Sequence, residues 1–436
     1  MSKKTINSRD STDLLLEGEG LDPHHHHGDG KFQLMKTGGV AASCFSFAAA
    51  SMGAGTLGLP SAMESAGALW GALMLVLVCV LTVYSIRLLV IVVEDRGYMT
   101  YEQMAHGLLG RFFEKTTAFL IVAFCWGVTI AYVVAIADVM GKLSVATWFP
   151  ESLSGPSGHK VLAIIYWGCF MLPLSLMKEI NALRYSSTIG VCSTIYLVTT
   201  LLVHSVNNGW ESAQKNLTIA RFDIGMVVSL PIFSFSYCCQ TNAFEIYTEM
   251  RPRTVNQMTK VATIAMIVCT SLYITAGVSG FANFGSATHG NVLNNLNPMD
   301  SVYIAIAFFA ITVTLTCAFP LCILPTRDAV LQVMGYESAY HTPTAVRVVV
   351  CATLSYASLV IGLYVPGIKV LFAVLGGICG STLAFLWPAI FYIKGVKGGF
   401  SVSNVGIGNV IGVVTLLFVG AVAAILGTAV SIIQEF

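Results

Sequence analysis

The chain has 436 residues, of which 56% are hydrophobic and only 10% are charged, with a net charge of +1 and a mean hydropathy of +0.77. Soluble domains carry about 25% charged residues, so this composition excludes a soluble protein and indicates an integral membrane protein whose main partner is the lipid bilayer. Nucleic acid is not expected as a partner, because binding it requires a strongly basic patch.

All twelve cysteines fall within apolar stretches, and the sequence contains no Cys-x-x-Cys pair. We therefore expect no disulfide framework, no metal site and no cofactor. Ionisable residues within the apolar stretches are isolated. A membrane-embedded enzyme needs such residues in clusters, so we expect no enzymatic activity.

The first 37 residues are polar and rich in Gly, Asp and Glu. This composition predicts a disordered tail over 1–37, followed by a single membrane domain over 38–436. The segment Asp10–Leu15 resembles an acidic dileucine sorting signal. We therefore expect either the plasma membrane or an endosomal, lysosomal or vacuolar membrane as the location.

The remainder of the chain predicts an all-α polytopic membrane protein, because a helix of about 20 apolar residues crosses the hydrocarbon core. Eleven apolar runs meet this requirement, and the polar connections between them are short. Their limits are 38–63, 68–93, 116–140, 159–176, 182–206, 224–249, 258–284, 300–325, 345–364, 367–393 and 406–433.

The distribution of Lys and Arg predicts the orientation. With the N-terminus in the cytoplasm, seventeen of the 23 basic residues lie on the cytoplasmic side and five outside, while Arg87 lies within a span. The positive-inside rule therefore favours a cytoplasmic N-terminus and an extracytoplasmic C-terminus. The sequon at Asn216 then falls in an outside loop, where glycosylation is possible.

The first span contains the segment Ser51–Pro60 (SMGAGTLGLP), which holds three glycines and a proline. Such residues are unfavourable inside a helix. A deliberately broken helix, with free amides and carbonyls facing a cavity, accounts for them, and transporters build binding sites in this way. The alternative is a continuous Gly/Ala-rich helix that packs closely against its neighbours.

The sixth span contains a dense group of polar residues between Ile224 and Glu249, including two serines, Gln240 and Glu245. If spans 1–5 and 6–10 form two inverted halves, this group lies in the position that corresponds to the anomaly of the first span. The pattern therefore predicts a 5+5 inverted-repeat core in which helices 1 and 6 are broken.

Several segments resemble the amino acid/auxin permease family of the amino acid–polyamine–organocation superfamily. They include Met52–Pro60 in the first span, Leu172–Leu176 near the fourth, Phe233–Cys238 in the sixth, Phe319–Leu321 in the eighth and Trp387–Ala389 in the tenth. The version of the sixth span in this chain looks most like the kinetoplastid permeases. The resemblance implies eleven spans and ion-coupled symport of amino acids or related amines.

The fold implied by this resemblance suggests how an amino acid would bind. Its carboxylate suits free amides at the start of a half-helix, where the helix dipole is positive, and its ammonium suits free carbonyls at half-helix ends. The candidate substrate-binding residues are Ser51, Met52, Gly53, Ala54, Gly55, Thr56, Ser234, Phe235, Ser236, Tyr237 and Glu245.

An ionisable residue within a span is by default a functional hypothesis, and Glu245 is the one in the sixth span. It could pair with the side chain of a basic substrate such as arginine or lysine, carry a proton, or form a structural pair with a nearby Lys or Arg. We expect the first role.

The coupling ion is expected to be a proton rather than sodium. Sodium sites in relatives use oxygens from spans 1 and 8, often with an Asn just before the glycine motif, where this chain has Ala49. Thr312 and Thr316 are the candidate ion-coupling residues that remain, with Thr314 as a further oxygen donor.

These observations predict a secondary active amino acid symporter that favours basic amino acids. A permease for neutral amino acids or polyamines is the alternative, as is a non-transporting amino acid sensor that uses the same site.

Overall fold

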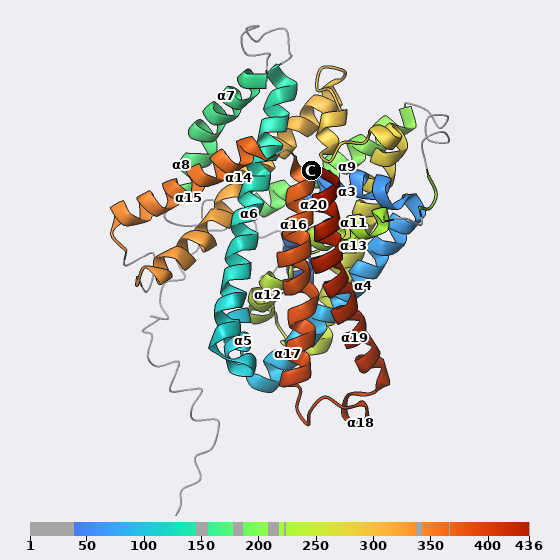
Figure 1. Ribbon diagram of the computed structural model, residues 1–436, viewed down its shortest axis with the longest axis vertical. Helices are drawn as coiled ribbons and strands as arrows, with labels where there is room; N and C mark the ends of the chain where they lie inside the picture. The colour runs from blue at the N-terminus through green and yellow to red at the C-terminus, as the bar shows by residue number, and fades with distance from the viewer. Residues whose placement is uncertain are drawn as a thin grey trace, which may run out of the picture. The chain divides into compact units, whose positions relative to one another are not determined.

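The computed structural model describes residues 39–144, 156–177, 186–207, 218–221, 224–336, 342–365 and 367–435. The predicted tail over 1–37 and the sequon at Asn216 lie outside these residues. Throughout the described part the regular structure is helical (Figure 1), which confirms the predicted all-α class.

Eight helical segments of the described chain are long and apolar enough to cross a membrane. They are α4 (Ala68–Arg96), α6 (Arg111–Ser144), α9 (Ser186–Asn207), α13 (Val255–Phe284), α14 (Val302–Val333), α15 (Thr344–Tyr364), α16 to α17 (Ile368–Gly395) and α19 to α20 (Ile407–Ser431).

A ninth span consists of two half-helices, α2 (Val40–Ser51) and α3 (Gly55–Ala66), which are bent by 64° at the break between them. The break falls within the predicted glycine-rich segment. Pro60 is not at the break but inside α3. The glycines rather than the proline therefore mark the point where the helix is interrupted.

Two other predicted spans consist of shorter pieces. Between 156 and 175 the helix α7 (Pro156–Tyr166) continues through the π-helical η2 (Trp167–Met171) into α8 (Leu172–Ser175). Between 225 and 249, α11 (Gly225–Ser236) ends in an irregular stretch, and the short η4 (Gln240–Asn242) then leads into α12 (Ala243–Glu249). The sixth predicted span is therefore interrupted, as expected.

The smaller elements lie between or within these spans. They are α5 (Tyr101–Leu109), η5 (Gly285–Ala287), η6 (Val292–Asn295), α18 (Val402–Val405) and the π-helical segments η7 (Leu375–Gly380), η8 (Thr382–Leu386) and η9 (Val422–Gly427).

The two broken spans lie at the centre of the packing. Helix α11 contacts α3, α4 and η7, while α13 contacts α2, α3, α4 and α9. Glycines permit the close approach of α13 to α3, because a Cβ atom on Gly280 would lie 2.5 Å from the Pro60 Cγ atom. Both breaks are thus held between packed helices.

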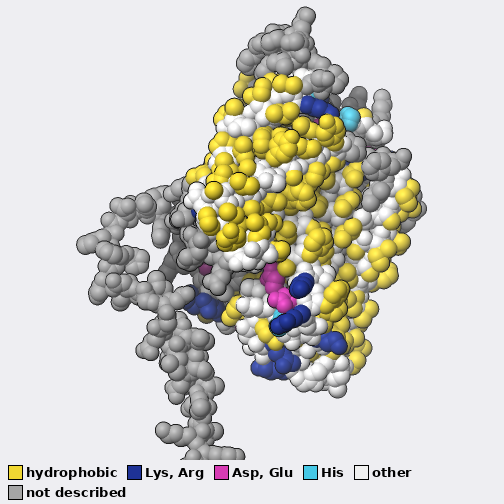
Figure 2. All heavy atoms as spheres, turned by 60° about the vertical axis from the view of Figure 1, so that its left-hand side comes forward, with side chains coloured by type: hydrophobic (Ala, Val, Ile, Leu, Met, Phe, Trp, Pro, Cys, Tyr) yellow, Lys and Arg dark blue, Asp and Glu magenta, His cyan; other side chains and the backbone are white. Residues whose placement is uncertain are grey.

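Large apolar side chains cover much of the outer surface, for example Val80 on α4, Ile267 on α13 and Phe309 on α14, which are 58%, 57% and 71% exposed. Figure 2 shows hydrophobic side chains, in yellow, spread over the upper part of the visible face, with most of the visible Lys and Arg toward its lower end. Such a surface suits lipid rather than water. The protein is therefore an integral, multi-pass membrane protein.

We call the end of the bundle where α4 and α17 both end the basic end. There the Arg96 side chain donates to the Gly395 carbonyl oxygen at 2.8 Å, and Lys397 pairs with Asp95 at 3.5 Å. Lys394 lies in the last turn of α17. Helix α5 packs against both α6 and α17 at the same end.

Candidate substrate and ion site

The break of the first span leaves backbone amides without helical partners. Among the described residues, the amides of Ala54 and Gly55 donate to no backbone carbonyl, whereas the Gly53 amide donates to the Ser51 carbonyl oxygen at 3.0 Å. These free amides stand at the N-terminal end of α3, where the helix dipole favours a negative group. Two of the predicted amides, those of Ala54 and Gly55, are thus without a backbone partner, whereas the Thr56 amide donates to the Gly53 carbonyl oxygen at 3.3 Å. That these amides bind a carboxylate stays a prediction.

Gly55 brings this end of α3 into close contact with the end of α11. A Cβ atom at position 55 would lie 2.7 Å from the Ser236 Oγ atom and 3.0 Å from its Cα atom. Only glycine fits at this distance without moving one of the helices. The two breaks are therefore adjacent in space.

The break of the sixth span is held by a buried glutamine. Gln240 is fully buried, and its Oε1 atom accepts a hydrogen bond from the Cys239 amide at 3.0 Å. Its Nε2 atom donates to the Ser85 Oγ atom of α4 at 3.3 Å. This polar residue therefore satisfies the interrupted backbone and anchors it to α4.

The carbonyl ends of α2 and α11 converge on one side chain. The hydroxyl of Tyr273, from α13, lies 2.8 Å from the Ser51 carbonyl oxygen and 2.9 Å from the Ser236 carbonyl oxygen, and donates toward both. Tyr273 is fully buried. Sequence reasoning did not select this residue, although a tyrosine in the middle of an apolar span is a signal that could have drawn attention to it.

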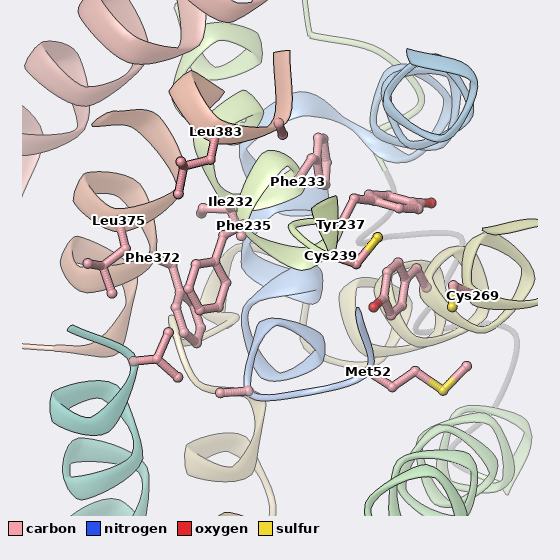
Figure 3. Close-up of a cluster of buried hydrophobic side chains, with 14 of the residues drawn as sticks. Met52, Ile232, Phe233, Phe235, Tyr237, Cys239, Cys269, Phe372, Leu375 and Leu383 are labelled. Carbon is pink, nitrogen blue, oxygen red and sulfur yellow. The ribbon is translucent and has the colours of Figure 1, made fainter. Parts of the chain in front are cut away.

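The candidate side chains of α11 point in different directions. The rings of Phe235 and Phe372 are stacked with their centroids 4.7 Å apart, and Phe124 of α6 lies 5.6 Å from Phe235. Tyr237 points to the opposite side of α11 (Figure 3), where its hydroxyl and that of Thr270 are 2.6 Å apart. We refer to Phe124, Phe235 and Phe372 as the aromatic wall.

The serine hydroxyls predicted to bind substrate have partners within their own helix. Ser234 donates to the Leu230 carbonyl oxygen at 2.9 Å, and Ser236 donates to the Ile232 carbonyl oxygen at 3.0 Å. Ser51 differs from them, because among the described residues its buried Oγ atom has no hydrogen-bond partner.

A small cavity of about 10 Å³ lies beside the first break. Its polar lining consists of the backbone at Gly53 and Ala54 and of Thr56, Thr194 and Thr314. The Thr56 Oγ1 atom is buried and has no hydrogen-bond partner among the described residues. A buried hydroxyl without a partner is costly, so this cavity has the chemistry of a site for a small cation or a water molecule.

The two threonines proposed for ion coupling do not line this cavity. The Thr312 hydroxyl donates to the Phe308 carbonyl oxygen at 2.7 Å, and the Thr316 hydroxyl lies 2.7 Å from the hydroxyl of Tyr166 on α7. Thr314, which the sequence offered as a further donor, is the threonine of α14 that lines it. Thr194 of α9 was missed because a threonine in a helix is common.

A larger cavity of about 670 Å³ lies between α5, α6 and the last turns of α14. Charged residues, including Arg111, Lys115 and Asp328, line it at the basic end, and it extends along α6 to Cys125. Cys125 is two helical turns, or about 10 Å, from Tyr132. The Tyr132 hydroxyl lies 3.8 Å from where a Cβ atom on Gly53 would be. The cavity therefore leads from the basic end toward the first break.

Glu245 is exposed, and so is Glu249 one turn later. Glu245 is in the first turn of α12, beyond η4, and the residues that line the two cavities do not include it. The sequence predicts Glu245 inside a span, but its side chain is exposed in the described arrangement. Its role in substrate selection stays a prediction.

On the far side of the first break, the loop between α13 and α14 packs against α3 and α6. Asn291 in this loop is 2% exposed and donates to Asp138 of α6 at 2.8 Å, and Val292 and Leu293 are fully buried. This loop covers the side of the site opposite the larger cavity.

Comparison with known proteins identifies the family of this chain. The sequence profile of the family described as "Transmembrane amino acid transporter protein" matches residues 36–433, which is nearly the whole chain. The chain belongs to this transmembrane amino acid transporter family. It is a transporter and not an enzyme, as expected, and it takes part in amino acid transport.

Two relatives within the family cover most of the chain. Sodium-coupled neutral amino acid symporter 2 of Danio rerio is 24% identical over 424 residues, which are 91% of this chain and 84% of the relative. Vacuolar amino acid transporter 2 of Saccharomyces cerevisiae is 26% identical over 351 residues, 77% of this chain and 72% of the relative. These proteins support the family but not the narrower likeness to kinetoplastid permeases.

A solved structure supports the fold. The structure of MhsT in complex with L-phenylalanine superimposes with a TM-score of 0.60 at 14% identity and covers 89% of this chain and 98% of that one. The two chains therefore share a fold. The relatives named as neutral amino acid symporters fit the neutral alternative better than the predicted preference for basic amino acids.

Proposed function

We propose that this transporter is a secondary active symporter of neutral amino acids that binds its substrate between the broken spans 1 and 6. The observation that carries the proposal is the contact between the two breaks, with the free amides of Ala54 and Gly55 beside it, in a chain of this family.

The architecture that we propose has eleven spans. It adds the α7–η2–α8 segment and the interrupted α11–η4–α12 segment to the nine spans defined by length and composition. Spans 1–5 and 6–10 then form the two inverted halves, with one break in each. The basic end faces the cytoplasm in this arrangement, by the positive-inside rule.

The amides of Ala54 and Gly55 bind the substrate carboxylate, and free carbonyls at the ends of the half-helices bind its ammonium group. The aromatic wall borders the space for the substrate side chain, and three apolar rings favour an uncharged one. Glu245 is exposed and stands outside this arrangement. Selection of arginine or lysine through Glu245 is the alternative.

Sodium is the coupling ion that we propose. The nine residues that line the small cavity include three threonines and no Asp, Glu, His, Lys or Arg. Hydroxyl and carbonyl oxygens suit a hard cation, whereas a proton needs a group that titrates in the working range. The absence of an Asn at Ala49 removes one familiar sodium ligand, and Thr56 and Thr194 offer oxygens in its place. Proton coupling is the alternative.

Uptake by purified protein in proteoliposomes tests the substrate and the ion together. We expect accumulation of a neutral amino acid such as alanine or glutamine when an inward sodium gradient is imposed, and little accumulation of arginine or lysine. Glu245→Gln should leave this uptake within about twofold of the wild type.

Other results would select the alternatives. Uptake that is driven by a pH gradient in sodium-free buffer would identify the proton as the coupling ion instead of sodium. If the wild type takes up arginine and Glu245→Gln abolishes this uptake, basic amino acids are the substrates and Glu245 selects them. Measurable amino acid binding without any uptake or exchange would identify a sensor and overturn the proposal.

A further inference from the structure

The ends of α2 and α11 create an electrostatic problem that one side chain resolves. The C-terminal end of a helix carries partial negative charge on its unpaired carbonyls. The Ser51 and Ser236 carbonyl oxygens, each at the last residue of its helix, both lie within 3 Å of a single oxygen atom. Without a positive group or a hydrogen-bond donor between them, these two helix ends would repel each other.

We propose that the Tyr273 hydroxyl is this donor and that Tyr273 is a positioning residue. Its hydroxyl forms a bridge between the Ser51 and Ser236 carbonyls and so fixes the positions of the two broken helices around the substrate. Its single hydrogen is shared between the two carbonyl oxygens at 2.8 and 2.9 Å. In membrane transporters, half-helix ends and unwound carbonyls commonly coordinate a cation. Here a neutral side chain fills the bridging position.

Burial makes this bridge effective. Tyr273 is fully buried, Ser236 is 1% exposed and Ser51 is 6% exposed, so water does not compete for either carbonyl. The backbone of Tyr273 belongs to α13. This helix also packs closely against α3 through Gly277 and Gly280. The hydroxyl is therefore presented from a helix that contacts both halves of the first span.

The bridge also restricts how the substrate binds. The Ser51 and Ser236 carbonyls already accept from Tyr273, so they are not the first choice for the substrate ammonium. Loss of the bridge would let the two breaks separate and would misplace the free amides of Ala54 and Gly55. We therefore expect Tyr273 to affect substrate affinity more than the maximal rate.

Tyr101 provides a matched control outside the candidate site. It is 2% exposed, and its hydroxyl also donates to a backbone carbonyl oxygen, that of Leu383 in η8, at 2.7 Å. This acceptor belongs to neither broken span. Tyr273→Phe and Tyr101→Phe thus remove the same atom from buried sites, and only the first removes the bridge.

The test compares both variants with the wild type by uptake in proteoliposomes, and so its transport readout depends on the proposed function. Tyr273→Phe should raise the substrate KM at least tenfold with a maximal rate within threefold of the wild type. Tyr101→Phe should change both by less than threefold. Replacement of Tyr273 with 4-aminophenylalanine, whose amino group can donate one hydrogen to each carbonyl, should return the KM to within threefold of the wild type.

Equal effects of the two phenylalanine variants, or a 4-aminophenylalanine variant as impaired as Tyr273→Phe, would overturn the proposal. If Tyr273→Phe does not fold, the 4-aminophenylalanine variant decides alone. Near-normal KM then supports the bridge, and failure to fold or a tenfold rise in KM refutes it.

A readout without transport separates this inference from the proposed function. The Gly53 amide donates to the same Ser51 oxygen that Tyr273 contacts. Hydrogen–deuterium exchange of peptides that cover 51–56 and 236–240 should therefore be at least tenfold faster in Tyr273→Phe than in Tyr101→Phe. If the wild type transports nothing, the proposed function fails, and this exchange difference still supports or refutes the bridge.

Discussion

At the scale of single residues, small size and unpaired oxygens matter more than charge in this site. Gly55 allows two broken helices to touch, and Thr56 keeps a buried hydroxyl without a partner among the described residues. The ionisable residue expected to determine specificity, Glu245, is exposed. Two predictions follow from the positions of individual atoms.

The first concerns Gly55→Ala. Its new Cβ atom would lie 2.7 Å from the Ser236 Oγ atom and 3.0 Å from its Cα atom, so α3 and α11 must separate. Overpacking of this kind costs about 1–3 kcal/mol, and we expect uptake to fall more than tenfold. Gly408→Ala in α19, where a Cβ atom meets nothing within 4 Å, is the control. Normal uptake by Gly55→Ala would show that the contact is not required.

The second concerns the small cavity. Thr314→Val removes an oxygen from its lining and keeps the volume of the side chain. If sodium binds there, the sodium concentration for half-maximal uptake should rise about tenfold, or ~1.4 kcal/mol. Thr312→Val is the matched control, because Thr312 lies two residues away and does not line the cavity. An equal shift in both variants would place the ion elsewhere.

At the scale of elements, single side chains attach the short helices to their neighbours. The short α12 is held by Glu94 of α4, which accepts from the Tyr247 hydroxyl at 2.7 Å and from the Val255 amide at 3.1 Å. Helix α5 is held to η8 by Tyr101, whose hydroxyl donates to the Leu383 carbonyl oxygen at 2.7 Å. Burial raises the pKa of Tyr101 well above its ordinary value, so this hydroxyl remains a donor.

The attachment of α12 can be tested by Glu94→Ala. The change removes the acceptor of the Tyr247 hydroxyl and of the Val255 amide. Because Glu94 is exposed, water can replace its carboxylate in part, and we expect a cost of about 1 kcal/mol. We expect a lower melting temperature in detergent. Glu114→Ala is the control, because Glu114 pairs with His106 at an exposed position where ion pairs contribute little. Equal melting temperatures for the two variants would mean that Glu94 does not secure α12.

At the scale of the whole membrane domain, the site is approached from one side. The larger cavity runs from the basic end to Cys125, while the Asn291 loop covers the opposite side. In the proposed orientation this arrangement is open toward the cytoplasm, and the small cavity beside the first break is closed to solutes larger than water.

Cys125 offers a test of this arrangement. A membrane-impermeant methanethiosulfonate should modify it from the side that the basic end faces, because the larger cavity extends from that end to Cys125. The Cys125→Ser variant should lose this labelling, and the native cysteines that remain provide the background. Labelling of Cys125 only from the other side would contradict the proposed orientation.

Much of the fold follows from local properties of the sequence. The break of the first span was predictable because glycine disfavours a helix, and that of the sixth because polar side chains such as Gln240 need partners. The roles of Tyr273 and Thr194 were not predictable, since they depend on which helices become neighbours. The exposure of Glu245 was not predictable either, because hydropathy locates a span but does not say which part of it is exposed.

Helix α13 contacts both halves of the first span as well as α4 and α9, and it carries Tyr273, Thr270 and the close-packed Gly277 and Gly280. Helix α19, by contrast, has large exposed side chains such as Ile411 and Phe418. In a library of all single substitutions selected for uptake, α13 should therefore accept few replacements on the buried face that carries these residues. The outer face of α19 should accept almost any apolar residue, so that tolerance alone would distinguish the central helix of this transporter from a peripheral one.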